Sequence, residues 1–278
     1  MEYLPYPSNR NEIHRVLESI DERLLRCTER FIRQQVRRPI LSLIQGSEKF
    51  YSLDDPRAEW FNIYSIYNAN QQINESCNKL WATIELSNVT SREIWNVKYD
   101  PVGENFHSAF MLGTLIPTLY YSQISAIISI LSSFGCIPIR VKDINYYLIR
   151  TEGGWMVFKR GNYVQQVLGL GAKSWHEIII KTYEGLTKKG VKLPKIQIKK
   201  TKDLKNLRNE FHYEILGDLK MWRPFKNINV YSKYLPTVVK TIQLALENLS
   251  KIKTVTTNCD RRFQNLLEKF KKTSMYKH

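Results

Sequence analysis

The chain has 278 residues, enough for one large domain, or for a core domain with an extended end, without metal or disulfide staples. Hydrophobic residues make up 43% and aromatic residues 12%, which excludes a mostly disordered protein. Lys and Arg outnumber Asp and Glu by 42 to 26, and this excess of positive charge needs an explanation.

The positive charge is concentrated in the last third of the chain. Residues 181–278 hold 23 basic and 8 acidic side chains, whereas residues 1–180 hold 19 and 18. Such an asymmetry predicts a polyanionic partner, either nucleic acid or an anionic membrane surface. The alternative is a solvated basic surface that keeps the protein soluble.

The cysteines point to an intracellular protein without a structural metal. They are far apart, with no CxxC pair and no paired Cys/His spacing, which predicts reduced thiols and no zinc site. We expect no cofactor, and no secretory signal is visible in the first ten residues, so we expect a cytoplasmic protein. The four positions are Cys27, Cys77, Cys136 and Cys259.

Apolar residues at steps of three and four predict a mainly helical chain. The first helix is expected over residues 11–38, ended by Pro39, and the second over residues 60–86. Irregular chain is expected over residues 39–58, and a loop over residues 96–105.

Residues 108–139 carry no charged side chain over 32 positions, long enough to cross a bilayer. Within them a helix is predicted from Ile116 to Phe134, with Gly135 as its end. Four serines at helical spacing favour close packing in a soluble bundle over a membrane span. They are Ser122, Ser125, Ser129 and Ser132.

The remaining chain reads as one hairpin followed by helices. Two β-rich runs within residues 145–160 predict a β-hairpin with Arg150, Lys159 and Arg160 on or near its surface. The segments that follow are a helix over 174–188 closed by Gly190, a basic linker over 192–205, a helix capped by Thr201 and running to about 220, a helix over 236–251, and a short basic helix over 260–272.

One local group of residues suggests chemistry. Arg208 and His212 are four apart and share one face of a helix. A guanidinium can hold a phosphate, and an imidazole can move a proton near neutral pH, so the pair suits metal-independent phosphodiester cleavage. A structural role for the pair is the alternative. His176 is a second catalytic candidate.

Two segments resemble HEPN domains. The stretch PTLYYSQISAIISILSSFG, residues 117–135, looks like their central helix, and LRNEFHY, residues 207–213, looks like their signature helix. The resemblance covers roughly residues 60–250. It implies an up-and-down helical bundle that dimerises, with the two signature helices forming one composite RNase site.

Carried over, the resemblance assigns cleavage to Arg208 and His212, with Asn209 in support. Three residues separate Arg208 from His212, whereas the nuclease motif usually has four to six, and non-nuclease relatives often share the shorter spacing. The resemblance therefore supports the fold more than the catalysis.

Together these features predict an RNA-acting, HEPN-like protein, with ribonuclease activity of the toxin or antiviral-defence kind. RNA is favoured over DNA, a homodimer is expected, and a regulatory protein partner is compatible. A non-catalytic nucleic-acid-binding module is the alternative, as is an interaction protein that uses its basic amphipathic ends. Phosphate contacts are expected from Lys199, Lys200, Lys202 and Lys205, and base stacking from Tyr213 and Trp222.

The predicted layout has three parts. An N-terminal helical extension occupies residues 1–58, a HEPN-like helical domain with the hairpin occupies residues 59–252, and a basic tail occupies residues 253–278.

Overall fold

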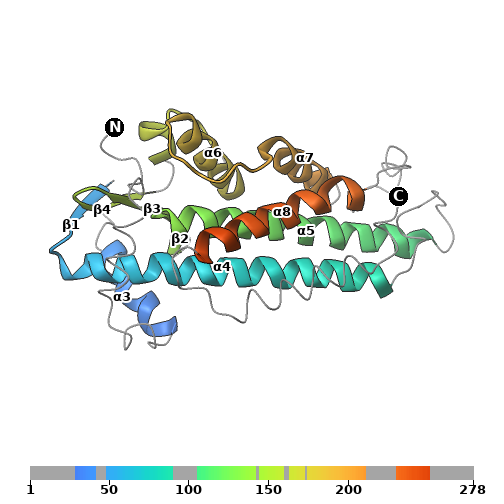
Figure 1. The fold of residues 1–278 in the computed structure, drawn as a ribbon, viewed down its shortest axis with the longest axis horizontal. Coiled ribbons are helices and arrows are strands. Elements are labelled where there is room, and N and C mark those ends of the chain that lie inside the picture. The colour runs from blue at the N-terminus through green and yellow to red at the C-terminus, as the bar shows by residue number, and fades with distance from the viewer. Residues whose placement is uncertain are drawn as a thin grey trace. The chain divides into compact units, whose positions relative to one another are not determined.

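The computed structural model describes residues 29–41, 48–89, 105–141, 144–159, 163–172, 174–210 and 230–250. They form a mainly helical fold with one small sheet (Figure 1). In chain order the elements are α3 (Glu29–Leu41), β1 (Glu48–Ser52), α4 (Pro56–Val89), α5 (Asn105–Ser133), β2 (Cys136–Val141), β3 (Ile144–Thr151), β4 (Gly154–Lys159), the π-helix η2 (Tyr163–Val167), α6 (Trp175–Lys188), α7 (Ile198–Asn209) and α8 (Val230–Ser250).

The chain divides into two compact units. The described residues of the sheet unit fall within 29–72, 127–194 and 245–250, and this unit holds the sheet, α3, η2 and α6. Those of the helical unit fall within 73–126, 195–210 and 230–244, and this unit holds α7. The long helices α4, α5 and α8 contribute residues to both units. The predicted division at residues 58 and 252 stays a prediction.

The sheet has four antiparallel strands in the order β1-β4-β3-β2. The β3–β4 pair confirms the predicted hairpin, whereas β1 and β2 were not predicted. Gly154 opens β4 with a φ of 156°, and a Cβ there would lie 2.1 Å from the Tyr51 carbonyl oxygen of β1. Only glycine therefore lets β1 approach the hairpin this closely.

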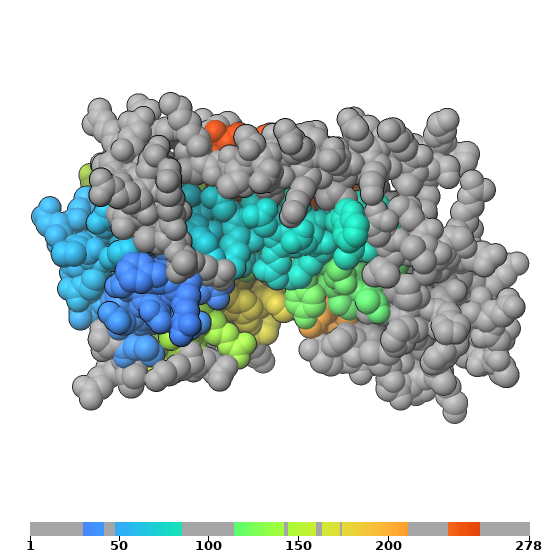
Figure 2. Space-filling view, turned by 90° about the horizontal axis from the view of Figure 1, so that it is seen from below, coloured from blue at the N-terminus to red at the C-terminus, as the bar shows by residue number. Residues whose placement is uncertain are grey.

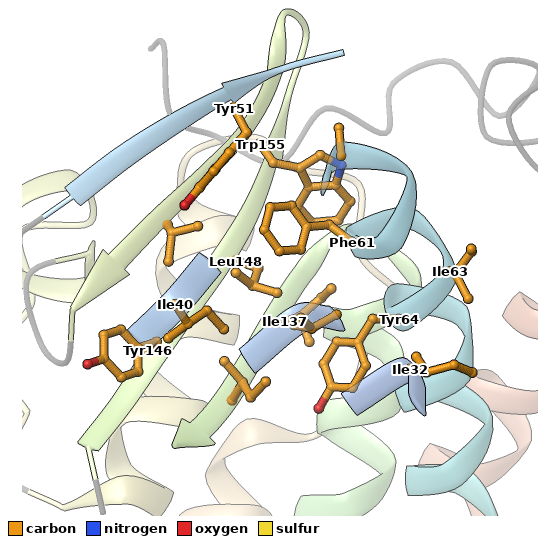
Figure 3. Close-up of a cluster of buried hydrophobic side chains, with 14 of the residues drawn as sticks. Ile32, Ile40, Tyr51, Phe61, Ile63, Tyr64, Ile137, Tyr146, Leu148 and Trp155 are labelled. Atoms are coloured by element: carbon orange, nitrogen blue, oxygen red, sulfur yellow. The ribbon is translucent and has the colours of Figure 1, made fainter. Parts of the chain in front are cut away.

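Both faces of the sheet are covered. On one face, Leu148 and Trp155 pack with α3 and the start of α4, as Figure 3 shows. On the other face, Tyr147 contacts Tyr163 of η2 and Thr182 of α6. Strand β3 is therefore buried along its length instead of alternating between buried and exposed residues.

Arg150 was predicted on or near the hairpin surface, and this is wrong. Its side chain is 5% exposed, and its Nη1 donates a 2.7 Å hydrogen bond to Asn62 Oδ1. The Trp155 indole N–H donates to the same oxygen, at 3.1 Å. The hairpin forms the two central strands of a sheet that is covered on both faces. Its arginine is therefore buried, and a buried charged group needs a hydrogen-bond partner within the protein. Lys159 is half-buried, and Arg160 lies outside the described residues.

Helix α3 lies against the first half of α4 (Figure 2), where Arg33 donates to Gln71 at 2.9 Å and Phe31 meets Trp60 edge to face. The helix passes Pro39 and ends at Leu41, later than predicted. A proline in the last turn removes only one helical hydrogen bond. Burial of the next residue, Ile40, in the core holds that turn in place.

Helix α4 begins four residues before its predicted start. Asp55 caps it, because its Oδ1 accepts the Arg57 backbone N–H at 2.9 Å, and Pro56 occupies the first helical position. Both are standard signals of a helix start. The Arg57 guanidinium lowers the pKa of the Asp55 carboxyl, chiefly through its side-chain hydrogen bond.

The predicted serine stripe packs α5 against α4. In the sheet unit, Ser129 Oγ donates to the Ala69 carbonyl at 2.8 Å, and the Asn68 amide donates to Ser132 Oγ at 2.8 Å. In the helical unit, Ser122 and Ser76 each donate to the other's backbone carbonyl, at 2.8 Å and 2.7 Å. Small hydroxyl side chains thus allow close helix approach and satisfy buried polar groups together.

Among the described residues, one helix segment, Thr114–Ser133, is apolar and long enough to cross a membrane, and 78% of it is buried within the fold. That burial indicates the core helix of a soluble fold. The helix itself starts at Asn105, eleven residues before the prediction, and continues through Pro117. Buried residues on both sides of this proline, Ile116 and Leu119, hold the helix together there.

Two of the three later helices differ from prediction at their starts. Ser174 caps α6 and Gly190 closes it with a φ of 90°, as expected. However, α7 starts at Ile198 inside the predicted linker, and α8 starts at Val230 instead of residue 236. Three predictions lie outside the described residues: the part of the first predicted helix (11–38) that precedes residue 29, the helix over 260–272, and the helix end near 220.

Candidate nucleic-acid interface

Helix α7 separates its lysines from its buried face. Thr201, Leu204, Leu207 and Arg208 are buried, at steps of three and four. Lys199 and Lys202 are exposed, on the opposite side of the helix, while Lys200 and Lys205 are half-buried beside the buried face. The helix therefore buries one face and exposes Lys199 and Lys202 on the other.

A buried glutamine fixes α7 in the helical unit. Gln123 of α5 donates through Nε2 to Thr201 Oγ1 of α7 at 2.9 Å and to Thr241 Oγ1 of α8 at 3.0 Å. Each threonine hydroxyl in turn donates to a backbone carbonyl of its own helix, so it accepts from the amide. One side chain thus ties three helices together and sets the position of the lysines.

Arg208 points to the interior of the helical unit. It is 8% exposed, and its Nη2 donates a 2.5 Å hydrogen bond to the Tyr121 hydroxyl of α5. Its Nη1 donates to Asn209 Oδ1 at 2.8 Å. The guanidinium carbon also lies 5.4 Å from the Tyr121 ring centre and 5.9 Å from that of Tyr120, within the range of cation–π attraction.

Tyr121 is contacted by a second cation. Lys79 Nζ of α4 lies 5.4 Å from the Tyr121 ring centre, and it also pairs with the Glu75 carboxylate at 2.6 Å. Tyr121 and Lys79 are half-buried, so both reach solvent. The neighbouring phenol, Tyr120, is buried; burial raises its pKa, and the Arg208 charge acts in the opposite direction.

The structure brings together part of the predicted site. Arg208 and Asn209 are in direct contact, and the four lysines lie on the same helix. His212, Tyr213 and Trp222 lie outside the described residues. His176 is half-buried on α6 and belongs to the sheet unit, whereas Arg208 belongs to the helical unit.

Tyr121 and Lys79 were not predicted as site residues. Tyr121 is visible in the sequence as half of the Tyr-Tyr pair, but its hydrogen-bond partner is 87 positions away. Lys79 sits in a helix whose sequence has no basic cluster, so nothing in its local sequence indicates the contact.

The lysines of α7 and the Tyr121 ring have the chemistry to bind a phosphate and to stack on a nucleobase. Ammonium groups bind phosphates without reading sequence, and phenol rings stack on bases. Within the described residues, no group of three or more His, Cys, Asp or Glu side chains could hold a metal ion.

Comparison with known proteins finds no matching family model, no similar curated protein and no similar solved structure.

Proposed function

We propose that the protein binds single-stranded RNA in the cytoplasm through the lysines of α7. The observation that carries this is the solvent-facing position of Lys199 and Lys202 on a helix whose other face is anchored in the core. Among the described residues, Lys199, Lys200 and Lys205 form no ion pair with a carboxylate, so their ammonium groups can bind phosphate.

The choice of RNA rests on charge and on resemblance. Sequence-independent phosphate binding explains the basic last third of the chain but does not distinguish RNA from DNA or from an anionic membrane. The likeness of residues 117–135 and 207–213 to HEPN domains favours RNA. The same likeness supports a HEPN-like bundle and a homodimer as parts of this proposal.

A charge-matched pair of variants tests the binding proposal. Replacing Lys199, Lys202 and Lys205 by Gln should weaken binding of a labelled single-stranded RNA at least about tenfold, because three phosphate contacts are lost. The control replaces Lys49, Lys188 and Lys189 by Gln; these are exposed and lie in the sheet unit.

Both triple variants lose three positive charges. A difference between their RNA affinities, measured by fluorescence anisotropy, therefore reflects where the lysines lie and not the total charge. Equal weakening by the two variants would contradict a binding face on α7. Anionic vesicles and single-stranded DNA of the same sequence serve as competitors: displacement of RNA by vesicles would favour a membrane partner.

A second candidate is metal-independent RNA cleavage of the toxin or antiviral-defence kind. The observation that favours it is the Arg208–Asn209 hydrogen bond, since the residue after the arginine does hold the guanidinium. In this function the RNA 2′-hydroxyl attacks phosphorus and the 5′-oxygen leaves, at a composite site in the dimer. Arg208 stabilises the negative charge on the phosphate oxygens, and His212 takes the proton from the 2′-hydroxyl or gives one to the leaving oxygen.

The cleavage candidate is tested with labelled RNA in EDTA, using the parent, Arg208→Ala and His212→Ala. Loss of proton transfer should slow cleavage by roughly 100-fold or more in the histidine variant. Thermal melting of each variant confirms that it is folded. Intact RNA with the parent protein, at concentrations that saturate binding, would rule out this activity for the isolated protein and leave binding as the function.

A further inference from the structure

Arg208 and Tyr121 differ in their access to solvent. The arginine is 8% exposed, and its two terminal nitrogens donate to Tyr121 and Asn209. The tyrosine is half-buried, so part of its side chain faces solvent. Of this hydrogen-bonded pair, the uncharged aromatic side chain is the better placed to meet a ligand.

We propose that Tyr121 is the RNA-contacting aromatic residue of the helical unit and that Arg208 is its positioning residue. This inference rests on the proposed RNA binding and names the residue that meets the nucleotide. Arg208 acts through Tyr121 in this arrangement, because the hydrogen bond to the phenol oxygen and the cation–π contact fix the ring from within the protein.

Fixing the ring in advance favours binding. A tyrosine that is free to rotate loses side-chain entropy when a base stacks on it, whereas a ring already held has little left to lose. The guanidinium holds Tyr121 at two points, at the hydroxyl and at the ring. An uncharged residue at position 208 could not make both contacts.

Lys79 supplies a phosphate contact beside the ring. Its ammonium group lies 5.4 Å from the Tyr121 ring centre. Its present partner, Glu75, has a side chain that is 46% exposed, and solvent-exposed ion pairs of this kind contribute little. The ammonium group can therefore exchange the carboxylate for a phosphate at small cost.

The lysines of α7 extend the same surface. Lys202, Lys205 and Asn209 follow each other at steps of three and four, so they form one strip along the helix, next to Arg208. Lys202 is exposed, and Lys205 and Asn209 are half-buried. An RNA strand that follows this strip reaches the end of α7 that contacts Tyr121.

The test measures RNA affinity and its salt dependence in the full-length protein. Tyr121→Ala should weaken binding of a labelled single-stranded RNA by roughly 5- to 100-fold, the range found for loss of one stacked base. It should leave the slope of log K against log salt unchanged, because no charge is removed. Tyr121→Phe, which keeps the ring, should lose less.

Arg208→Gln decides between positioning and direct phosphate contact. If Arg208 only positions Tyr121, the Arg208→Gln variant should keep the parent's slope of log K against log salt. In a protein that already carries Tyr121→Ala, Arg208→Gln should weaken RNA binding by less than about a further twofold, because the effects of coupled residues are not additive. A direct phosphate contact would instead reduce the slope by about 0.7. Lys79→Gln, in contrast, should reduce the slope by about that amount.

Two controls complete the experiment. Phe50→Ala removes a 50% exposed aromatic side chain from the sheet unit and should leave RNA affinity unchanged. Circular dichroism melting shows whether Arg208→Gln is folded; the tyrosine variants carry the test if it is not. Unchanged affinity in Tyr121→Ala, alongside loss of binding in the α7 lysine variant, would overturn this inference alone. Absence of salt-dependent RNA binding in the parent would overturn the proposed function itself.

Discussion

Two buried tyrosines of the sheet unit differ in one hydrogen bond. Tyr147 and Tyr163 are both 0% exposed, and their rings lie 5.6 Å apart. The Tyr147 hydroxyl lies 3.0 Å from Thr182 Oγ1, whereas the Tyr163 hydroxyl has no hydrogen-bond partner among the described residues. Burial raises the pKa of both phenols well above the usual range, so both stay neutral.

Removing the two hydroxyls should therefore have different effects. Tyr147→Phe loses a buried hydrogen bond and should lower the free energy of unfolding by about 1 kcal/mol, whereas Tyr163→Phe should leave it unchanged or raise it slightly. Urea denaturation of both variants checks this. Equal destabilisation would mean that Tyr163 has a bound water or another partner.

At the residue scale, part of the site could be predicted from the sequence. Lys199 and Lys202 were expected to contact phosphate from a basic linker, and the structure exposes both, but on a helix. The resemblance to HEPN domains makes Arg208 a candidate site residue but does not predict its burial, because its partner Tyr121 is 87 positions away and only the tertiary fold joins them. Arg150 was misplaced for the same reason: its partner Asn62 lies on α4, 88 positions away.

At the element scale, one buried amide joins α7 to α5 and α8. Gln123 donates to Thr201 and Thr241, and its Oε1 accepts no hydrogen bond within the described part of the chain. Both threonine hydroxyls already donate to backbone carbonyls. A carboxylate at position 123 would therefore be buried without a donor.

Gln123→Glu should destabilise the protein by about 3 to 5 kcal/mol at pH 7, as for an uncompensated buried charge. Burial would raise the pKa of the new carboxyl in the folded state, so the variant should regain stability relative to the parent as pH falls from 7 to 5. Thermal melting across this range checks the trend. Gln197→Glu, on an exposed residue near Thr237, is the control and should show neither effect. A pH-independent loss in Gln123→Glu would contradict this account.

Predictions of elements succeeded where the signal is local. The hairpin has a turn glycine, Gly154, and α6 has a capping residue, Ser174. Both elements were predicted. Strand β1 was missed because it pairs with β4, about 100 residues later. The start of α7 was misplaced because its first turn is lysine-rich and has little apolar pattern; Thr201 is held inside the helix by Gln123, not at its end as a cap.

For the whole molecule, the central feature is where the charge lies. The excess of 16 positive charges is a property of the entire chain, but 15 of them fall within residues 181–278. This concentration of positive charge does not stabilise the fold, because like charges repel each other in a compact structure. In the function we propose, a polyanion neutralises this charge and binds at the exposed lysines of α7.

The most direct test is the slope of log K against log salt for a labelled single-stranded RNA, measured for the parent and for both lysine triple variants. Each phosphate contact on a single strand contributes about 0.7 to the slope, so loss of Lys199, Lys202 and Lys205 should reduce it by about 2. The control variant with Lys49, Lys188 and Lys189 replaced should keep the parent slope. Equal slopes in the parent and the α7 variant would contradict RNA binding by this helix.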